Sequence, residues 1–538
     1  MKSILLPAAC FLVFSTQAQL VIDNATFFIG EGAVVTVQGN LTSNVAIQAG
    51  GSGATLGKIQ LKGNAIQNIN TNGFVIPRLE IDNAMNASLV GDVRVGSLLE
   101  FTNGKFLLGT ANFILENATV VSNAGPSKFL EANGTGEARR LVAANVADKV
   151  IPVGFGSNYT PFMYTTTGGT YDAGAFVGVK ATGSAIPTPQ RHPRTESFLG
   201  TAWKVNRSGI PTGTLAGKGT YVDGQVTGTE ADIVGMSWNG TTWALGTGQD
   251  VATNFVGANI PVGATDLYGM NKFILTNVKT FLQGSYNSGG LMKDVLRNQN
   301  QVFTPGNPPN NNILPLADPY RTADYLTSFP HFENADPEAI ALSVLNNSAN
   351  AGDNIVDWVF VELRTNATPS VVVQTRSALI QRDGDIVDID GVSNLYFKKV
   401  DPNNYNIAVK HRNHVGVRTA NPQAISLTQP VALLNLSTSA ANYLNGVAAT
   451  LSGGLFGLYG GNANKNANTR ISGVDGTISD YEFIKGFVGA AAQVLGYSSS
   501  DVNMNRNSRI SGVDATVSDF EFIKSVLGSA AQRAQPTF

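Results

Sequence analysis

The sequence has almost no cysteine and little charge. Its only cysteine among 538 residues is Cys10. The chain after Cys10 therefore forms no disulfide and offers neither a thiolate nucleophile nor a cysteine ligand for a metal. Charged residues make up only 14% of the chain, and 36 basic side chains nearly balance 38 acidic ones. A nucleic acid or an anionic membrane surface would need a basic patch, so we predict no nucleic-acid partner.

Catalytic motifs and membrane-spanning runs are also lacking. No stretch after the N-terminus is long and apolar enough to cross a membrane, which predicts no transmembrane segment. The sequence contains no nucleophile elbow, phosphate-binding loop or zinc-protease motif. Carboxylates are numerous, but none stands out as the acid and base pair of a glycosidase. We therefore predict a protein that is not an enzyme, and a glycoside hydrolase or lyase is the least favoured function.

The N-terminal residues 1–18 have the features of a secretory signal peptide. Lys2 supplies the positive start, residues 4–14 are apolar, and Thr16-Gln17-Ala18 resembles a cleavage site with small residues. The pattern predicts cleavage after Ala18 and a secreted, extracellular protein. Because a secreted chain without disulfides needs other support, we expect large cores and bound cations to stabilise it.

Short β-type runs fill residues 19–135. Examples are "AVVTVQGNL", "KIQLKG", "PRLEIDNA" and "NFILENATVVS", each with alternating apolar residues and with Gly or Asn at its ends. Asn and Gly permit left-handed turns at the corners between strands. The regular recurrence favours a β-solenoid over a β-sandwich for this first domain.

Residues 136–278 keep the β pattern but contain more aromatic residues, which predicts a β-sandwich domain. The stretch "WNGTTW" at 238–243 indicates a hairpin with Asn-Gly at its turn. Trp203, Trp238 and Trp243 could form a platform for stacking sugars, although core packing is the favoured role for such residues.

The pattern changes twice more before the C-terminus. Residues 279–330 are rich in Pro, Asn and Gly with a broken apolar pattern, and they predict an irregular linker. In residues 331–428, about seven strand-like runs at regular spacing predict an immunoglobulin-like or transthyretin-like sandwich with Trp358 in its core. Residues 429–538 form a C-terminal segment that ends in a duplication within 455–538.

The duplication repeats a polar loop followed by the start of an amphipathic helix. The copies read "NANKNANTRISGVDGTISDYEFIK" at 462–485 and "DVNMNRNSRISGVDATVSDFEFIK" at 501–524. In each copy a Ser-x-x-Glu capping box, Ser479 to Glu482 and Ser518 to Glu521, marks the start of the helix. The expected fold is thus mainly β and multi-domain, with a small helical module at the C-terminus.

The loop residues have the types and spacing of calcium ligands. Calcium needs six to eight oxygens, and a short loop supplies them from alternate residues. The candidate metal ligands of the second copy are Asp501, Asn503, Asn505, Asp514 and Asp519; those of the first are Asn462, Asn464, Asn466, Asp475 and Asp480. Asparagine offers an oxygen but no charge, so we expect weak sites suited to extracellular calcium, with the second copy binding better than the first. A calcium-free, decayed repeat is the alternative.

This duplicated loop-helix segment resembles a dockerin module, in which "DFEFIKSVLG" matches the helix entry after the last calcium-binding Asp. Two departures stand out. Asp519 is at position 19 counted from Asp501, an insertion of seven residues relative to that family. The glycine expected at position 6 is replaced by Ala467 and Arg506, which disfavours the usual sharp turn.

A wider resemblance extends over most of the chain. The segments "DWVFVELR", "RSALIQRDGDIVDIDG", "NYNIAVKHRNHVGV" and "FTNGKFLLG" are similar to parts of secreted surface proteins of Bacteroidota. This resemblance implies an exported, cell-surface associated protein without a catalytic role.

The sequence therefore predicts a structural or adhesion protein with a calcium-stabilised C-terminal module. Its partner would be a protein at the cell surface or a second copy of itself. The alternative is a carbohydrate-binding accessory protein that docks into an assembly that degrades polysaccharides. Its partner would then be a glycan.

Two further clusters of side chains are weaker candidates for metal sites. Asp383, Asp385, Asp388 and Asp390 in "RDGDIVDIDG" could bind a cation or form turns, and His411 and His414 in "HRNH" are expected at the surface.

Overall fold

The computed structural model of the chain describes residues 19–183, 194–246, 248–297, 313–332, 338–345, 350–425, 427, 431–473, 478–511 and 517–538. These residues are mainly β-strand, which confirms the predicted main class of the fold. They belong to two compact units, Met1–Lys272 and Phe273–Phe538. The predicted signal peptide lies outside the described residues.

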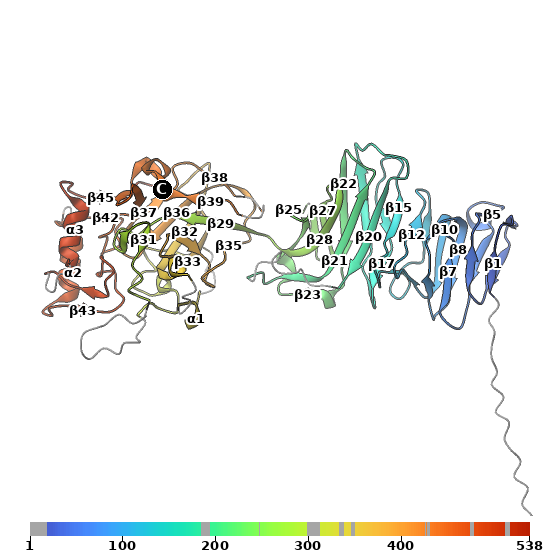
Figure 1. Cartoon of the computed structure of the whole chain (residues 1–538), viewed down its shortest axis with the longest axis horizontal. Helices are drawn as coiled ribbons and strands as arrows, with labels where there is room; N and C mark the ends of the chain where they lie inside the picture. The colour runs from blue at the N-terminus through green and yellow to red at the C-terminus, as the bar shows by residue number, and fades with distance from the viewer. Residues whose placement is uncertain are drawn as a thin grey trace, which may run out of the picture. The chain divides into compact units, whose positions relative to one another are not determined.

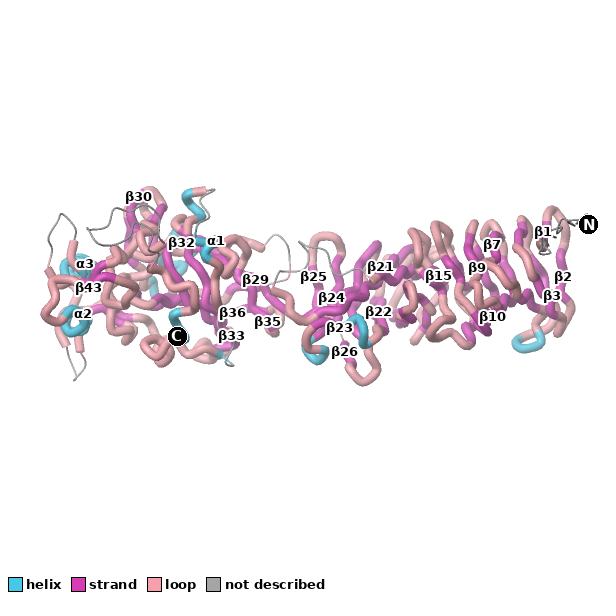
Figure 2. The backbone as a smooth tube through the Cα atoms, turned by 90° about the horizontal axis from the view of Figure 1, so that it is seen from below, coloured by secondary structure: helices cyan, strands magenta, loops and turns pink. Residues whose placement is uncertain are grey.

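The first unit begins as a stack of parallel strands, and the solenoid-like stacking agrees with the prediction (Figures 1 and 2). Successive coils place their strands in three columns. The first column contains β1 (Leu20–Ile22), β4 (Leu41–Ser43), β7 (Gln67–Asn70), β9 (Ala87–Leu89), β11 (Phe106–Leu107), β14 (Leu130–Glu131) and β17 (Val153–Phe155), and ends with the antiparallel β18 (Asn158–Tyr159). The second contains β2 (Phe27–Ile29) and β5 (Ile47–Ala49). The third contains β3 (Val34–Val37), β6 (Lys58–Leu61), β8 (Val75–Asp82), β10 (Val93–Asn103), β12 (Phe113–Leu115) and β15 (Ala138–Leu141), with β13 (Val120–Ser122) beside β10.

Alternation within each strand explains the stack. In β6, Ile59 and Leu61 are fully buried, while Lys58 and Gln60, which alternate with them, remain partly exposed. A period of two directs alternate side chains to the inside of the coil. At corners between strands, Asn24, Asn72 and Asn86 have positive φ values of 50°, 47° and 77°. The predicted left-handed asparagine turns are thus confirmed at these corners.

The third column continues directly into antiparallel strands. β15 pairs in parallel with β12 on one side and antiparallel with β20 on the other. The continuation contains β20 (Phe176–Thr182), β21 (Phe198–Ser208), β28 (Gly263–Asn271), β24 (Ile233–Trp238) and β25 (Trp243–Leu245), with β23 (Val226–Thr227) beside β21. A second antiparallel sheet contains β16 (Lys149–Ile151), β19 (Phe162–Thr167), β22 (Thr214–Thr220), β27 (Phe255–Asn259) and β26 (Gly248–Asp250).

One hydrophobic core extends through this unit. It runs from Ile22 in the first coil to Leu267 in β28, and it includes the fully buried Trp203. The change of sequence pattern expected at residue 136 is therefore a change of strand direction within one sheet. The two predicted domains, 19–135 and 136–278, share one core, and the first unit ends at Lys272.

The second unit is built on a mostly antiparallel sheet in the order β35-β29-β34-β33-β32-β36-β37. These strands are β35 (Leu395–Lys398), β29 (Phe273–Lys279), β34 (Asp385–Val387), β33 (Val372–Gln381), β32 (Ile355–Thr365), β36 (Asn403–His411) and β37 (His414–Arg418); β38 (Gln423–Ile425) pairs with β36 and β39 (Leu433–Asn435) pairs with β29. Trp358 in the central β32 is fully buried, which confirms its predicted core position. The immunoglobulin-like or transthyretin-like type of this sheet stays a prediction.

The segment expected as a linker contributes to the interior of the second unit. Its described parts contain few regular elements, yet Tyr320 is fully buried and Phe329 is 4% exposed. Their rings lie 5.5 and 5.7 Å from that of Phe360 in β32, and the Tyr320 hydroxyl donates to the Trp358 carbonyl at 2.8 Å. The irregular segment therefore covers one face of the sheet with aromatic side chains.

Small elements complete the second unit. The helices are α1 (Leu342–Leu345), α2 (Asp480–Val488) and α3 (Asp519–Leu527). The two-stranded pairs are β30 (Tyr286–Ser288) with β31 (Leu291–Met292), β40 (Ala449–Leu451) with β41 (Leu455–Gly457), β42 (Asn468–Thr469) with β45 (Arg533–Ala534), and β43 (Val494–Leu495) with β44 (Asn507–Ser508). Short 3-10 helices lie at Gly53–Thr55, Asp223–Gln225, Glu230–Asp232, Pro319–Arg321, Ala351–Asp353, Leu436–Thr438, Ala440–Asn442 and Leu444–Gly446.

Candidate functional site

Both copies of the duplicated segment begin their helix at a capping serine, as predicted. Ser479 Oγ accepts a hydrogen bond from the backbone N–H of Glu482 at 3.2 Å, and its own N–H donates to Glu482 Oε2 at 3.2 Å. Ser518 Oγ accepts from the N–H of Glu521 at 3.2 Å, while the Glu521 carboxylate pairs with Lys524 Nζ at 3.0 Å. The first helix thus has a reciprocal capping box, and the second has its serine half.

In the second copy, Asp519 folds back onto the loop that precedes it. Its Oδ1 accepts from the backbone N–H groups of Val502 at 2.8 Å and Asn503 at 3.3 Å, and its Oδ2 accepts from the N–H of Arg509 at 2.8 Å. The seven-residue insertion therefore leaves the helix-entry carboxylate in contact with the start of the loop. Asp514 lies outside the described residues.

Asp501 lies at the start of the same loop and is fully buried. Its Oδ1 accepts from the backbone N–H of Asn505 at 2.9 Å and its Oδ2 from that of Arg506 at 2.8 Å. Burial raises the pKa of Asp501 to about 6. Burial, followed by the nearby charge of Asp501, raises the pKa of Asp519 well above its usual value. A buried carboxylate whose charge raises the pKa of a second one makes a place where a cation is favoured.

Two asparagine oxygens of this loop, Asn503 Oδ1 and Asn507 Oδ1, are buried without a hydrogen-bond donor. Asn503 donates from Nδ2 to the Val517 carbonyl at 2.7 Å, but its Oδ1 is buried and accepts no hydrogen bond. Asn505 Oδ1 accepts from the backbone N–H of Asn507 at 3.0 Å. An oxygen buried without a donor costs free energy, and a cation ligated there would remove that cost.

The first copy reproduces the hydrogen bonds with fewer charges. Asp480 accepts from the backbone N–H of Asn464 at 3.2 Å and of Arg470 at 2.9 Å. Asn462 Oδ1 takes the place of the Asp501 carboxylate and accepts from the N–H of Asn466 at 3.1 Å. Burial raises the pKa of Asp480 to about 7. The predicted ligand Asp475 lies outside the described residues.

Both loops make the sharp turn without glycine. Ala467 and Arg506, at position 6, have φ values of 68° and 75°, and Lys465 and Met504, at position 4, have φ values of 63° and 54°. The missing glycine was expected to disfavour this turn, yet both loops make it. The aspartate or asparagine side chain at position 1 accepts backbone hydrogen bonds that hold the turn, against a cost of about 1–2 kcal/mol for each left-handed residue.

The two copies interlock as a pseudo-symmetric pair. The strand that follows α2, β43, pairs with β44 in the second loop, and the strand that follows α3, β45, pairs with β42 in the first loop. Tyr481 and Phe520, which occupy the same position in each copy, lie with ring centroids 4.4 Å apart. Ile484 and Ile523 are fully buried in the shared core. The copies therefore fold as one module.

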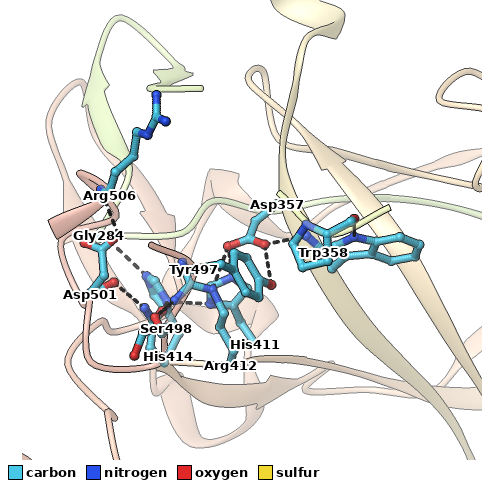
Figure 3. A network of polar contacts seen from close by, with 12 residues as sticks. Gly284, Asp357, Trp358, His411, Arg412, His414, Tyr497, Ser498, Asp501 and Arg506 are labelled. Atoms are coloured by element: carbon cyan, nitrogen blue, oxygen red, sulfur yellow. Dashed lines mark hydrogen bonds and ion pairs between the residues drawn. The ribbon is translucent and has the colours of Figure 1, made fainter. Parts of the chain in front are cut away.

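A buried polar network joins the second copy to the central sheet (Figure 3). Arg412, at the β36–β37 turn, donates from Nε to Asp357 Oδ2 at 2.9 Å and from Nη1 to the Ser498 carbonyl. The Tyr497 hydroxyl donates to Asp357 Oδ1 at 2.8 Å, and the Arg412 guanidinium lies 4.4 Å from the centroid of the Tyr497 ring. Asn413 Nδ2 donates to the Asp501 carbonyl at 2.6 Å. Burial alone would raise the pKa of Asp357, but the charge of Arg412 and the bond from His411 lower it.

His411 and His414 belong to this network, and the expectation that they are surface residues is wrong. Both are 1% exposed. His411 Nε2 lies 3.0 Å from Asp357 Oδ2, and the Nδ1 atoms of the two rings are 2.9 Å apart. His414 Nε2 accepts from the backbone N–H of Gly284 at 2.9 Å, so its Nδ1 carries the proton. Burial lowers the pKa of both imidazoles, and the two rings are neutral.

The sequence analysis did not identify this network, although it contained one signal. Asp357 stands within the run "IVDWVFV", where every neighbour is apolar. A carboxylate on a fully buried strand requires a partner, because an isolated buried charge is costly. Its partner, Arg412, lies 55 residues later in the chain, and no local pattern connects the two.

The four aspartates of "RDGDIVDIDG" do not gather around one point. Asp383 and Asp385 pair with Lys279 Nζ at 3.1 and 3.0 Å, Asp388 pairs with Arg376 at 3.1 Å, and Asp390 accepts from the backbone of the following turn. Their partners are a lysine, an arginine and backbone N–H groups, which supports the turn and strand interpretation over a cation site.

The tryptophans of the first unit are buried. Trp203 is fully buried, and Trp238 and Trp243 are 8% and 5% exposed, with ring centroids 5.0 Å apart. These side chains form packing contacts and no exposed row. An edge of Trp238 lines a shallow hollow of about 460 Å³ together with the polar residues Glu137, Lys204, Asn206, Asn239 and Asp266.

The residues of the second loop fit a calcium ion better than those of the first. Asp501, Asp519 and Asn503 could hold the ion with carboxylate and amide oxygens, whereas the first loop offers one described carboxylate, Asp480. Among the residues that the structure describes, no group of three or more His, Cys, Asp or Glu side chains could hold a metal ion. A calcium ion here would therefore need amide, backbone or water oxygens to complete its six to eight ligands.

Comparison with protein-family models, with curated proteins and with solved structures found no match. Within the described ranges, no helix is long and apolar enough to cross a membrane.

Proposed function

We propose that this chain is a secreted, non-catalytic protein of the cell surface, with a structural or adhesive role, of the kind found in Bacteroidota. Its C-terminal module, residues 462–538, would be a dockerin-like pair of loops stabilised by extracellular calcium. The observation that carries the proposal is the pair of buried carboxylates Asp501 and Asp519, which interact electrostatically in a loop that also contains the unpaired Asn503 oxygen.

The electrostatics of the second loop support a cation there. The charge of Arg412 lowers the pKa of Asp501, but Arg412 also pairs with Asp357. The guanidinium of Arg506 is a second positive charge near Asp501. A dication would offset the remaining negative charge, and it would supply a partner for the Asn503 oxygen.

Differential scanning calorimetry of the full chain tests the proposal. For a dissociation constant of about 0.1–1 mM and calcium at about 10 mM, binding adds about 1.4–2.7 kcal/mol to the stability of the module. The transition of the second unit should therefore move upward in calcium and return in chelator. Asp385→Asn, which changes a carboxylate in the same unit away from the loops, is the matched control for Asp501→Asn.

The expected result is that Asp501→Asn loses most of the calcium response while Asp385→Asn keeps it. If the transition of the second unit is the same in calcium and in chelator, the calcium proposal fails for both loops.

Carbohydrate binding is a second candidate, supported by the hollow on the first unit. Its lining combines an edge of Trp238 with amide and carboxylate side chains, a combination typical of sugar recognition. Titration with oligosaccharides should then show binding that Asp266→Ala abolishes. Asp250→Ala, at a half-buried position on a different strand of the same unit, is the control, and equal binding by both variants would exclude this hollow.

A further inference from the structure

The first coil of the solenoid has an open edge on all three of its strands. β1 pairs with β4, β2 with β5 and β3 with β6, all in parallel. Among residues 19–183, no strand pairs with the other edge of β1, β2 or β3. Figure 2 shows these three strands together at one end of the stack. Each open edge carries unpaired backbone N–H and C=O groups that can pair with another chain.

The coil lacks the residues that usually protect such an edge. Proteins prevent edge pairing with lysines, prolines, bulges or a covering segment. From Gln19 to Gly57 the sequence contains no Lys, Arg or Pro. Its acidic side chains are already engaged within the stack, because Asp23 Oδ1 accepts from Asn44 and Glu31 Oε1 accepts from Thr55 Oγ1. Both carboxylates are thus bonded to residues that follow in the stack, while their side chains remain exposed.

The outward side chains of this coil are apolar, unlike those of the next coil. Val21, Phe28 and Val34 are 55%, 61% and 49% exposed. Their register partners in the second coil are polar, since Val21 is beside Thr42, Phe28 beside Gln48 and Val34 beside Lys58. Exposed apolar side chains also occur at other positions of the stack, but those of the first coil lie on the three strands with open edges, where they indicate an interaction surface.

We propose that this end binds the same end of a second copy of the chain, forming a two-fold dimer through strand pairing. A single added strand would satisfy one edge, whereas the first coil of another copy offers three edges at the same spacing. A two-fold axis perpendicular to the stack, passing through β3, pairs β3 with β3 of the second copy and β1 with its β2. The strands that would pair have equal lengths: β3, which pairs with itself, has four residues, and β1 and β2 have three residues each.

This pairing is antiparallel and closed. The middle residues of β1 and β2, Val21 and Phe28, point outward and would lie opposite one another across the interface. Cross-strand pairs of aromatic and β-branched residues favour such contacts. Because the same patch is used on both copies, assembly stops at the dimer. The inference goes beyond the calcium proposal and does not depend on it.

Sedimentation equilibrium of the chain beginning at Gln19 tests the dimer over a wide range of concentrations. We expect dimer for the wild type, in calcium and in chelator alike. The triple variant Val21→Lys, Phe28→Lys, Val34→Lys should be monomeric, because it places like charges around the paired edges. The matched control is Ile66→Lys, Val90→Lys, Val120→Lys, at positions 53%, 59% and 60% exposed elsewhere in the unit, which should dimerise normally.

Disulfide trapping locates the contact, since Cys10 is outside the chain used. A mixture of the Val21→Cys and Phe28→Cys variants should give a disulfide-linked dimer on oxidation, and Val120→Cys should not link to either. A wild type that is monomeric at every concentration overturns the proposal. So does a dimer that survives the triple edge variant with unchanged far-ultraviolet circular dichroism, or one equally weakened by the control variant.

Discussion

The two copies of the C-terminal loop have nearly the same backbone and different charges. Asn462 and Asp501 accept the same hydrogen bond, from Asn466 and Asn505 respectively, at 3.1 and 2.9 Å. The geometry of the turn therefore does not require a carboxylate at position 1. What the carboxylate adds is charge, and the second copy places two buried carboxylates where the first has one. The difference separates residues that shape the loop from residues that could bind a cation.

The copies also differ in how they are attached to the sheet. The first copy is held through backbone N–H groups of Gly461 and Asn462, which donate to the Asn413 carbonyl at 3.1 and 3.0 Å. The second is held through the Arg412 side chain and the Tyr497 hydroxyl. The side chains that attach the second copy can be removed by substitution, so the difference in attachment between the two copies can be tested.

The largest effect is expected for Arg412→Met. The substitution leaves Asp357 fully buried without its ion-pair partner, which costs about 3–5 kcal/mol. Urea unfolding of the second unit should show this loss. The matched variant Arg382→Met, which removes a partly exposed arginine of the same unit, should cost far less. Equal losses would contradict the role given to the buried network.

The next effect concerns pH in chelator. The folded-state pKa values of Asp480 and Asp501, about 7 and about 6, lie above the usual 3.8. Folding therefore favours the protonated carboxyls. Their contribution to stability is fully present below about pH 4 and is lost as the pH rises, by about 3 kcal/mol up to about pH 6 for Asp501 and by about 4 kcal/mol up to about pH 7 for Asp480.

Asp480→Asn should thus stabilise the chelated chain increasingly from pH 4 to pH 8, as followed by the midpoint of thermal unfolding. If the difference in unfolding midpoint between Asp480→Asn and the wild type does not change with pH, Asp480 is not a buried carboxylate that ionises at a cost.

The Asn462→Asp variant sharpens the comparison by giving the first copy the charge of the second. In calcium, it should tighten binding at the first loop by roughly tenfold, or about 1.4 kcal/mol. In chelator, the added buried charge should lower the stability of the module. Calorimetric titration measures the first effect and thermal unfolding the second. A variant that is equally stable with and without calcium would show that the first loop excludes the ion.

The smallest effect is expected at the helix caps. Ser479→Ala and Ser518→Ala each remove a hydrogen bond to the N3 backbone, at a cost of about 0.5–2 kcal/mol. Ser479 Oγ also donates to Glu482 Oε2 at 3.1 Å, whereas Glu521 pairs with Lys524. Ser479→Ala should therefore cost more than Ser518→Ala in chemical denaturation. The reverse order would contradict the difference between the two caps.

Local patterns predicted much of this fold. Alternation and asparagine corners identified the stacked strands, and the serine caps identified the starts of α2 and α3, because these features depend on neighbours in the sequence. The spacing of oxygen-bearing side chains at loop positions 1, 3 and 5 also selected Asp501 and Asn503. Asp519, at the start of the following helix, contacts the same loop.

Long-range contacts set the limit of that prediction. The pairing of Asp357 with Arg412 and His411 joins residues more than fifty positions apart, and it buries histidines that local pattern placed at the surface. The left-handed Ala467 and Arg506 show the same limit, since propensity disfavours them and the surrounding hydrogen bonds decide the outcome. The common core of the first unit likewise depends on sheet continuity that no local pattern reveals.

Calcium titration by calorimetry of two equivalent variants, Asp519→Asn and Asp480→Asn, shows which loop binds the ion. We expect Asp519→Asn to abolish the stronger calcium binding of the wild type, while Asp480→Asn leaves it in place. Loss of the stronger binding in Asp480→Asn but not in Asp519→Asn, or the absence of calcium binding by the wild type, would show that the second loop is not a calcium site.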